Sequence, residues 1–371
     1  MFEKVKAQCD AFLPMGVPGF DLLILQNGKE ILRYMGGYSD LENKIPVNGN
    51  ERYHIYSCSK VITCTAALQL WEQGKYSLED KLSDYMPEFA HMTVQTETGI
   101  QPAKNPIRIH HLFEMTAGFS YDMVSPAVKA CQEATDGKCP TREFMKYLAK
   151  EPLLFEPGEK YKYSLCHDVL AALIEVISGM KVQDYMEQYI FRPVGMENTS
   201  YMAAPICKKY RYRAEEKVFA ETTANSYRIG TEYASGGAGA VSTVEDYMKM
   251  LEALRTGKLL KPETLKLMTT GRLTADQLRE NFPSVGSRNY GLGVRTPIDS
   301  HPHGEFGWGG AAGAFWSVDM ERKMSIYYSQ HVLLSPNNDL RNQIYALAFD
   351  ELTGMKTATV ERNEKLKNLT Y

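Results

Sequence analysis

The stretch YHIYSCSKVITCTAALQLWEQGK (residues 53–75) decides the fold, because it reads as the start of a helix that faces a core. Its apolar residues between Val61 and Trp71 recur at mostly helical spacing, and Gly74 follows where a helix would end. The pattern predicts a helix over residues 57–73, with a polar first turn and a buried remainder.

The polar first turn contains Ser57, Ser59 and Lys60, and Ser57 and Lys60 have the spacing Ser-x-x-Lys. Residues three apart share a helix face, and the free N–H groups at a helix start favour negative charge on an oxygen. A second match begins at Ser178, but it lies at the end of a helical pattern, where Gly179 interrupts the geometry. The first turn leaves two interpretations open: Ser57 is a nucleophile with Lys60 as its base, or a serine only caps the helix.

The composition permits a large core and excludes several function classes. The chain has 371 residues, 44% of them hydrophobic, and a net charge of −3, which indicates neither nucleic acid nor a membrane surface as a partner. No run approaches the roughly 18 apolar residues of a membrane span. The seven cysteines are dispersed, as is typical of reduced thiols. The first residues contain no apolar leader, so we expect a cytoplasmic protein.

Strand patterns at the two ends of the chain enclose a helical middle. Residues 20–38 predict a hairpin with Asn27 and Gly28 at its turn, and strand patterns return after about residue 287. Two strands do not form a stable sheet alone, so the N-terminal pair is expected to join the C-terminal strands. This organisation predicts an α/β (α+β) fold with an antiparallel sheet flanked by helices and built from both chain ends.

The same organisation predicts the domains. We expect residues 1–79 and 256–371 to form the sheet domain and residues 80–255 to form an inserted, mostly helical domain. Gaps between such regions are where ligand sites usually form. We therefore expect the active site in the cleft between them, at the polar end of the helix over residues 57–73.

Five segments, in order, resemble the serine β-lactamase and penicillin-binding-protein superfamily, specifically its class C branch. The resemblance covers roughly residues 15 to 350. It implies a β-lactamase/transpeptidase-like fold, with Ser57 as nucleophile and Lys60 as its partner. The segments are RYHIYSCSKVITCTAALQLWEQGKYSLEDKLSDYMPEF (52–89), IRIHHLFEMTAGF (107–119), FEPGEKYKYSLCHDVLAALIEVISG (155–179), GGAGAVSTVEDYMKMLEAL (236–254) and FGWGGAAGAFWSVD (306–319).

The third of these segments is similar to the one that carries the superfamily's catalytic tyrosine. That tyrosine usually stands in Tyr-x-Asn, whereas here the chain reads Tyr163-Ser164-Leu165, so leucine replaces the asparagine. The resemblance implies that Tyr163 acts as general base towards Ser57 and that Leu165 contacts substrate. Tyr161 is the nearby competitor, at a position that the superfamily commonly fills with another aromatic residue.

The last segment aligns Trp308-Gly309-Gly310 with the superfamily's Lys-Thr-Gly or His-x-Gly strand, and the cation is absent. The resemblance implies that substrate lies against Trp308, Gly309 and Gly310. It also implies that the N–H groups of Ser57 and Ala311 form the oxyanion hole. Tryptophan supplies an apolar wall where the superfamily binds a carboxylate, and this departure is similar to family VIII carboxylesterases and to lovastatin-type acyltransferases.

The sequence therefore predicts a serine hydrolase that forms an acyl-enzyme, with a carboxylesterase acting on small or apolar esters as the main hypothesis. The alternatives are a β-lactamase or D-alanyl peptidase, an acyltransferase, and an inactive binding scaffold. We expect a small ester or amide substrate and no cofactor. We expect no metal either, because neither His110-His111 nor the pair His301 and His303 has a ligand-set spacing. The glycines at 236–239 are interpreted as a turn before a helix capped by Ser242 or Thr243.

Overall fold

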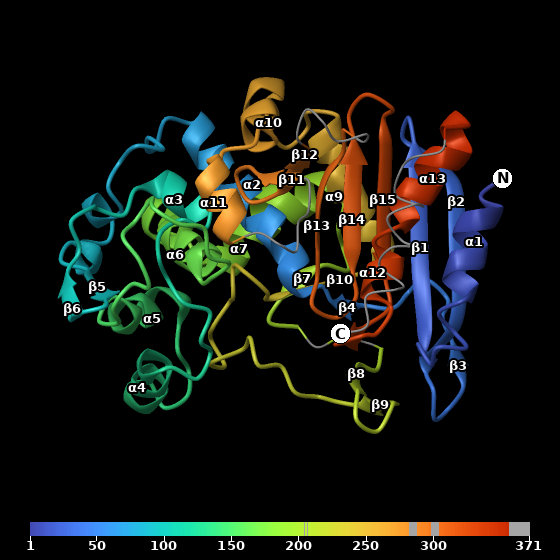
Figure 1. The fold of residues 1–371 in the computed structure, drawn as a ribbon, viewed down its shortest axis with the longest axis horizontal. Coiled ribbons are helices and arrows are strands. Elements are labelled where there is room, and N and C mark those ends of the chain that lie inside the picture. The colour runs from blue at the N-terminus through green and yellow to red at the C-terminus, as the bar shows by residue number, and fades with distance from the viewer. Residues whose placement is uncertain (204, 206, 282–287, 298–303, 356–371) are drawn as a thin grey trace.

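The computed structural model describes all residues except 204, 206, 282–287, 298–303 and 356–371. An eight-stranded sheet combines strands from both ends of the chain, which confirms the expected sheet built from both chain ends (Figure 1). In spatial order its strands are β11 (Arg288–Tyr290), β12 (Arg295–Pro297), β13 (Phe306–Gly309), β14 (Phe315–Asp319), β15 (Met324–Ser329), β1 (Gly19–Gln26), β2 (Lys29–Asp40) and β3 (Ile45–Pro46).

The join between the two chain ends is the antiparallel pair β1 and β15, with Asp21 opposite Ser329. The hairpin from β1 to β2 turns at Asn27 and Gly28, as expected. Both residues have positive φ, 51° and 75°, which a two-residue turn of the I′ kind requires and which asparagine and glycine tolerate best. The turn residues thus set the pairing next to the turn, and an irregularity between Ile24 and Leu25 shifts the register by one residue beyond it.

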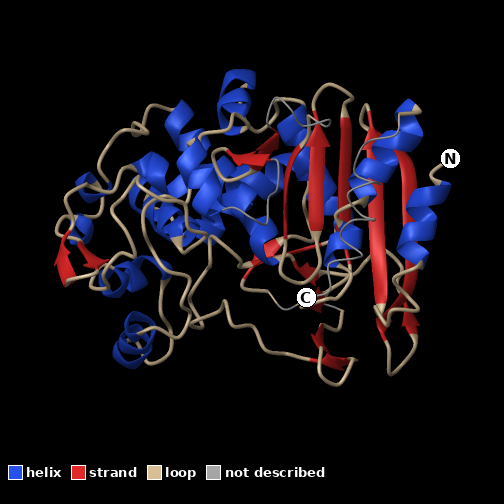
Figure 2. Cartoon of the chain, viewed as in Figure 1, coloured by secondary structure: helices blue, strands red, loops and turns tan. Residues whose placement is uncertain are grey.

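The sheet has helices on both faces (Figure 2). Alternate residues of β1 face opposite sides, so Leu22 and Ile24 join one core cluster and Leu23 joins the other. The cluster with Ile24 also holds residues of α1 (Glu3–Asp10) and α13 (Ile344–Thr353), and α12 (Asn338–Arg341) lies beside α1. On the other face lie α2 (Ser59–Glu72) and α9 (Val244–Arg255), and α9 contacts β1 and β15.

The remaining helices lie mainly to one side of the sheet (Figure 1). They are α3 (Ile109–Phe113), α4 (Pro126–Ala134), α5 (Thr141–Leu148), α6 (Cys166–Ser178), α7 (Val182–Met186), α8 (Arg192–Val194), α10 (Pro262–Met268) and α11 (Ala275–Asn281), with the short turns η1 (Tyr56–Cys58), η2 (Leu82–Asp84), η3 (Pro87–Phe89) and η4 (Glu187–Phe191). The division into a sheet domain (1–79 and 256–371) and a helical domain (80–255) stays a prediction. Helix α9, which that division assigns to the helical domain, packs against strands β1 and β15 of the sheet.

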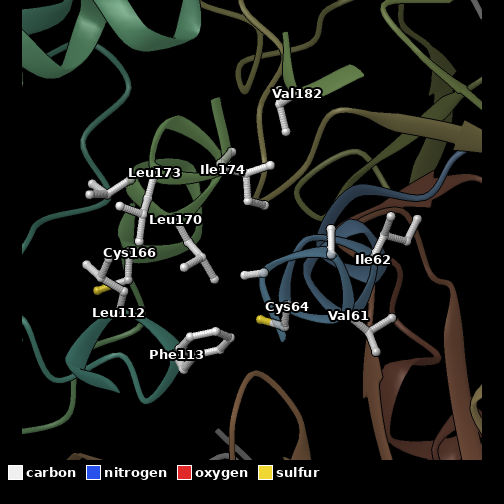
Figure 3. Close-up of a cluster of buried hydrophobic side chains, with 14 of the residues drawn as sticks. Val61, Ile62, Cys64, Leu112, Phe113, Cys166, Leu170, Leu173, Ile174 and Val182 are labelled. Atoms are coloured by element: carbon white, nitrogen blue, oxygen red, sulfur yellow. The ribbon is translucent and has the colours of Figure 1, made fainter. Parts of the chain in front are cut away.

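Helix α2 is buried around almost its whole circumference, which is why its sequence is apolar beyond one face. Figure 3 shows Cys64 of α2 pointing towards Leu170 of α6 and Phe113 of α3. The helix expected from residue 57 begins as the tight turn η1, so Ser57 precedes α2 by two residues. Packing against α6 and the sheet therefore holds the polar start of α2 in one place.

Three smaller sheets complete the described structure. The strands β4 (Tyr53–His54), β10 (Ala240–Ser242) and β7 (Ser200–Tyr201) form one of them; β16 (Val332–Leu333), β8 (Tyr210–Arg213) and β9 (Val218–Glu221) form the second; β5 (Thr93–Thr96) and β6 (Gly99–Pro102) form the third. In the described part of the chain, no helix has both the length and the apolar character needed to cross a bilayer.

Candidate active site

The turn that carries Ser57 follows strand β4, and a backbone hydrogen bond attaches its start to strand β10. The N–H of Ile55 donates to the carbonyl of Ala240, 3.2 Å away, at the end of the pair β4 and β10. Tyr56 has φ of 47°, in the left-handed region that an aromatic residue rarely adopts. The chain therefore reverses sharply just before Ser57, and such strained positions persist only where surrounding contacts hold them.

Lys60 lies one helical turn beyond Ser57 and is fully buried. Its Nζ is 3.4 Å from Ser57 Oγ, 2.8 Å from the Gly237 carbonyl oxygen and 3.3 Å from the Tyr121 hydroxyl. The structure thus brings together the serine and the lysine that the spacing Ser-x-x-Lys predicted. Ser59 points elsewhere, because its Oγ accepts the N–H of Ala240 at 3.0 Å.

Tyr163 lies with the face of its ring beneath Lys60. Lys60 Nζ is 4.5 Å from the centre of the Tyr163 ring, and the Tyr163 hydroxyl accepts a hydrogen bond of 3.4 Å from Trp308 Nε1. Within the described residues, no hydrogen bond joins Tyr163 to Ser57. Its role as general base stays a prediction, whereas Tyr161 is buried against Tyr290 with ring centres 5.5 Å apart.

Tyr121 is a member of the site that sequence reasoning missed. Its ring stacks on Tyr163 with centres 5.5 Å apart and planes 9° from parallel, and its hydroxyl accepts from Lys60. Burial raises the pKa of Tyr121 well above its usual value, so its phenol keeps its proton. Tyr121 follows the segment 107–119 by two residues, and nothing in its local pattern distinguishes it from an ordinary packed ring.

A second group missed by the sequence is the carboxylate of Asp168, in the first turn of α6. Its Oδ1 accepts hydrogen bonds from Tyr233 (2.7 Å), Ser235 (2.6 Å) and the N–H of Gly237 (3.4 Å). These bonds fix the loop whose Gly237 carbonyl accepts from Lys60. A Cβ at Gly237 would lie 2.7 Å from Asp168 Oδ2 and 3.1 Å from Lys60 Nζ, so any larger residue here would displace one of these two groups.

The glycine run at 236–239 therefore has a role beyond the expected turn. The expected helix cap is also present, since Thr243 Oγ1 accepts the N–H of Asp246 at the start of α9. Close approach of the chain at Gly237 gives the buried lysine a carbonyl acceptor. The pattern predicted the turn but not the acceptor.

Strand β13 and the turn after it lie next to the Ser57 turn. A Cβ at Gly310 would be 2.3 Å from the carbonyl oxygen of Ile55, so the two backbones are in direct contact. Ala311 is exposed, and its N–H has no hydrogen-bond partner within the described residues. Trp308 extends from β13 and stacks on Tyr163, with ring centres 5.6 Å apart. This arrangement suits the oxyanion hole expected from Ser57 and Ala311.

Leu165 does not reach the surface of this site. It is 1% exposed and packs in the core beneath α6, because it stands at the start of that helix and its side chain turns inward. The Leu165 side chain is therefore part of the core packing of α6. The expected substrate contact of Leu165 therefore stays a prediction, and Tyr163, two residues earlier, is the residue of the segment that contacts Lys60 and Trp308.

The histidines have structural contacts. His110 Nδ1 is 3.1 Å from Glu114 Oε2, and His111 Nδ1 accepts the N–H of Arg108 at 3.1 Å. His301 and His303 lie outside the described residues. Across the part of the chain that is described, no three His, Cys, Asp or Glu side chains gather as ligands for a metal ion.

Comparisons with known proteins give relatives along nearly the whole chain. The chain is 26% identical to esterase EstB of Burkholderia gladioli over 342 residues, which covers 82% of this chain and 83% of the esterase. It is also 26% identical to acyltransferase calJ of Penicillium decumbens over 349 residues, covering 83% and 82%. Both relatives therefore extend over the sheet and the helical region.

Solved structures share the fold. EstCE1, described as a hydrolase with promiscuous acyltransferase activity, superposes with a TM-score of 0.78 at 25% identity, covering 94% of this chain and 98% of EstCE1. Unliganded simvastatin synthase from Aspergillus terreus superposes with a TM-score of 0.78 at 20% identity, covering 95% and 98%. The β-lactamase/transpeptidase-like fold expected from the resemblance is thereby confirmed.

The family assignment rests on the whole set of elements that build the site. The Beta-lactamase family profile matches residues 13–348 and so includes the Ser57 turn, α6, the Gly237 loop and β13. With the site geometry and the shared fold in agreement with that match, the chain belongs to the Beta-lactamase family.

Proposed function

We propose that this protein is a serine esterase that forms an acyl-enzyme with small or apolar esters. The observation that carries the proposal is the Lys60 amine, fully buried and 3.4 Å from Ser57 Oγ at the start of α2. A buried base in reach of a hydroxyl is the arrangement that activates serine as a nucleophile. The esterase and acyltransferase names of the relatives support the same chemistry.

In acylation, Ser57 Oγ attacks the ester carbonyl and its proton passes to Lys60 in the amine form, with Tyr163 relaying it onward. The carbonyl oxygen becomes an oxyanion, which accepts from the N–H groups of Ser57 and Ala311. When the tetrahedral intermediate collapses, the bond to the alcohol oxygen breaks and the alcohol leaves with the proton. The acyl group remains on Ser57 as an ester.

In deacylation, water or an acceptor alcohol attacks the acyl-enzyme, loses its proton to the same pair of bases and restores Ser57. Hydrolysis and acyl transfer differ only in that acceptor, so acyl transfer to an alcohol is the second candidate function. Trp308 favours esters over β-lactams, because its indole supplies an apolar face and no positive charge for a carboxylate. Lys60 and Tyr163 form the proposed proton path, and neither requires a cofactor.

Labelling with a fluorophosphonate probe, followed by mapping of the modified residue, tests this proposal. We expect the probe on Ser57 and hydrolysis of p-nitrophenyl butyrate that Ser57→Ala abolishes. Ser59→Ala is the matched control, since Ser59 only accepts the buried N–H of Ala240. It should lower stability by about 1–3 kcal/mol and keep most of the activity. Label on another residue, or wild-type turnover by Ser57→Ala, would remove the mechanism.

A further inference from the structure

The small sheet of β16, β8 and β9 lies against the turn that follows β13. The strands β8 and β16 pair in parallel, with Tyr210 opposite Val332. The N–H of Val332 donates to the carbonyl of Ala312 at 2.7 Å. Ala312 directly follows Ala311, whose N–H is one of the two expected oxyanion donors. This sheet therefore holds one side of the expected oxyanion hole through its backbone.

Lys209, the residue directly before β8, contacts the other side. Its Nζ donates to the Tyr56 hydroxyl at 2.9 Å and to the Ala224 carbonyl at 2.7 Å. Tyr56 directly precedes Ser57, whose N–H is the second expected donor. The left-handed backbone of Tyr56 is costly for a residue with a bulky side chain, so contacts to that side chain decide whether the turn keeps its shape.

The environment of Lys209 is unusual for a lysine. The side chain is buried, and no carboxylate among the described residues pairs with its ammonium. Burial lowers the pKa of Lys209 to about 8. The adjacent Lys208, in contrast, forms ion pairs with acidic side chains at the surface, including Glu42 and Glu221. A buried cation without a carboxylate destabilises a fold, so a neutral side chain would serve packing better.

We propose that Lys209 is a positioning residue that joins the sheet of β16, β8 and β9 to the Ser57 turn and so fixes the distance between the N–H groups of Ser57 and Ala311. This inference rests on the proposed function, because it assigns those two groups to the oxyanion. The hydrogen bond to Tyr56 supplies one attachment of the sheet, and the hydrogen bond from Val332 to Ala312 supplies the other.

A double-mutant cycle tests the link, with Lys209→Met, Tyr56→Phe and the double variant measured on p-nitrophenyl butyrate. Displacement of one oxyanion donor by a fraction of an ångström to 1 Å should lower kcat by about tenfold to a hundredfold with little change in KM. Because both substitutions remove the same hydrogen bond, the double variant should be no slower than the slower single variant. Lys208→Met, at the neighbouring surface lysine, should keep wild-type kcat.

Active-site titration by fluorophosphonate separates positioning from folding. A merely structural role would reduce the fraction of protein that is labelled, or its melting temperature, while kcat per labelled site stayed at the wild-type value. That result, or independent and multiplicative losses in the double variant, would overturn the positioning role and leave the esterase proposal intact. Failure of wild-type protein to label at Ser57 would instead overturn the esterase proposal, and this inference with it.

Discussion

Replacing Gly310 by alanine should slow catalysis about a hundredfold in a protein that still folds. The new Cβ would lie 2.3 Å from the Ile55 carbonyl oxygen, whereas carbon and oxygen in close contact are about 3.3 Å apart. The turn after β13 must therefore move away from the Ser57 turn by about 1 Å. Misplacement by 1 Å costs about 10²-fold in rate, or about 2.7 kcal/mol of activation free energy.

The assay is kcat/KM on p-nitrophenyl butyrate, with the melting temperature and circular dichroism measured in parallel. Gly310 has φ outside the left-handed region, so alanine brings no backbone strain and the effect reports the contact alone. Gly304→Ala is the matched control, since a Cβ there meets nothing within 4 Å. Wild-type kcat/KM in Gly310→Ala would refute the reasoning that β13 and the Ser57 turn must stay in direct contact.

Tyr121, Trp308 and His111 each lead to a further measurable expectation. Tyr121→Phe removes the hydroxyl that accepts from Lys60 and should lower kcat about tenfold, and unchanged steady-state kinetics would contradict this. Nitrocefin carries a carboxylate, and a hydrogen bond to such a charged group is worth about 1.5–3 kcal/mol. Because Trp308 offers no positive charge to form it, kcat/KM for p-nitrophenyl butyrate should exceed that for nitrocefin by about tenfold or more. Faster turnover of nitrocefin would favour a β-lactamase. Burial lowers the pKa of His111 from 6.5 to about 4, so its contribution to stability is full above pH 6.5 and is lost as the pH falls towards 4. Urea midpoints should therefore fall less on acidification for His111→Asn than for the wild type.

The fold was predictable because its decisive signals are local. The Asn27-Gly28 turn fixes a hairpin, and a hairpin without further strands must find partners elsewhere in the chain. The pairing of β1 with β15 is the consequence. The proximity of Ser57 and Lys60 was predictable from their spacing of three residues, whereas their expected roles came from the resemblance of five segments to the superfamily.

The rest of the site depends on contacts between distant segments, which no local pattern encodes. Tyr121 is 61 residues from Lys60 in sequence, and Gly237 is 177 residues from it. Their approach depends on how α6 and the Gly237 loop pack beside α2. The packing of α6 beside α2 likewise decides that the Tyr163 ring lies under Lys60 and that the Leu165 side chain turns inward.

The closing pair of β1 and β15 also determines when the candidate active site can be completed during synthesis of the chain. Ser329 leaves the ribosome about 300 residues after its partner Asp21 (329 minus 21), a delay of about 15–60 s at ordinary rates of translation. Throughout that interval β1 has no partner on one edge, and until β13 (Phe306–Gly309) is made near its end, the nascent chain carries Ser57 and Lys60 without the strand that would face them. Translation that stops short of β15 therefore releases a fragment with an open, apolar strand edge on β1, which is a substrate for chaperones and a hazard for aggregation.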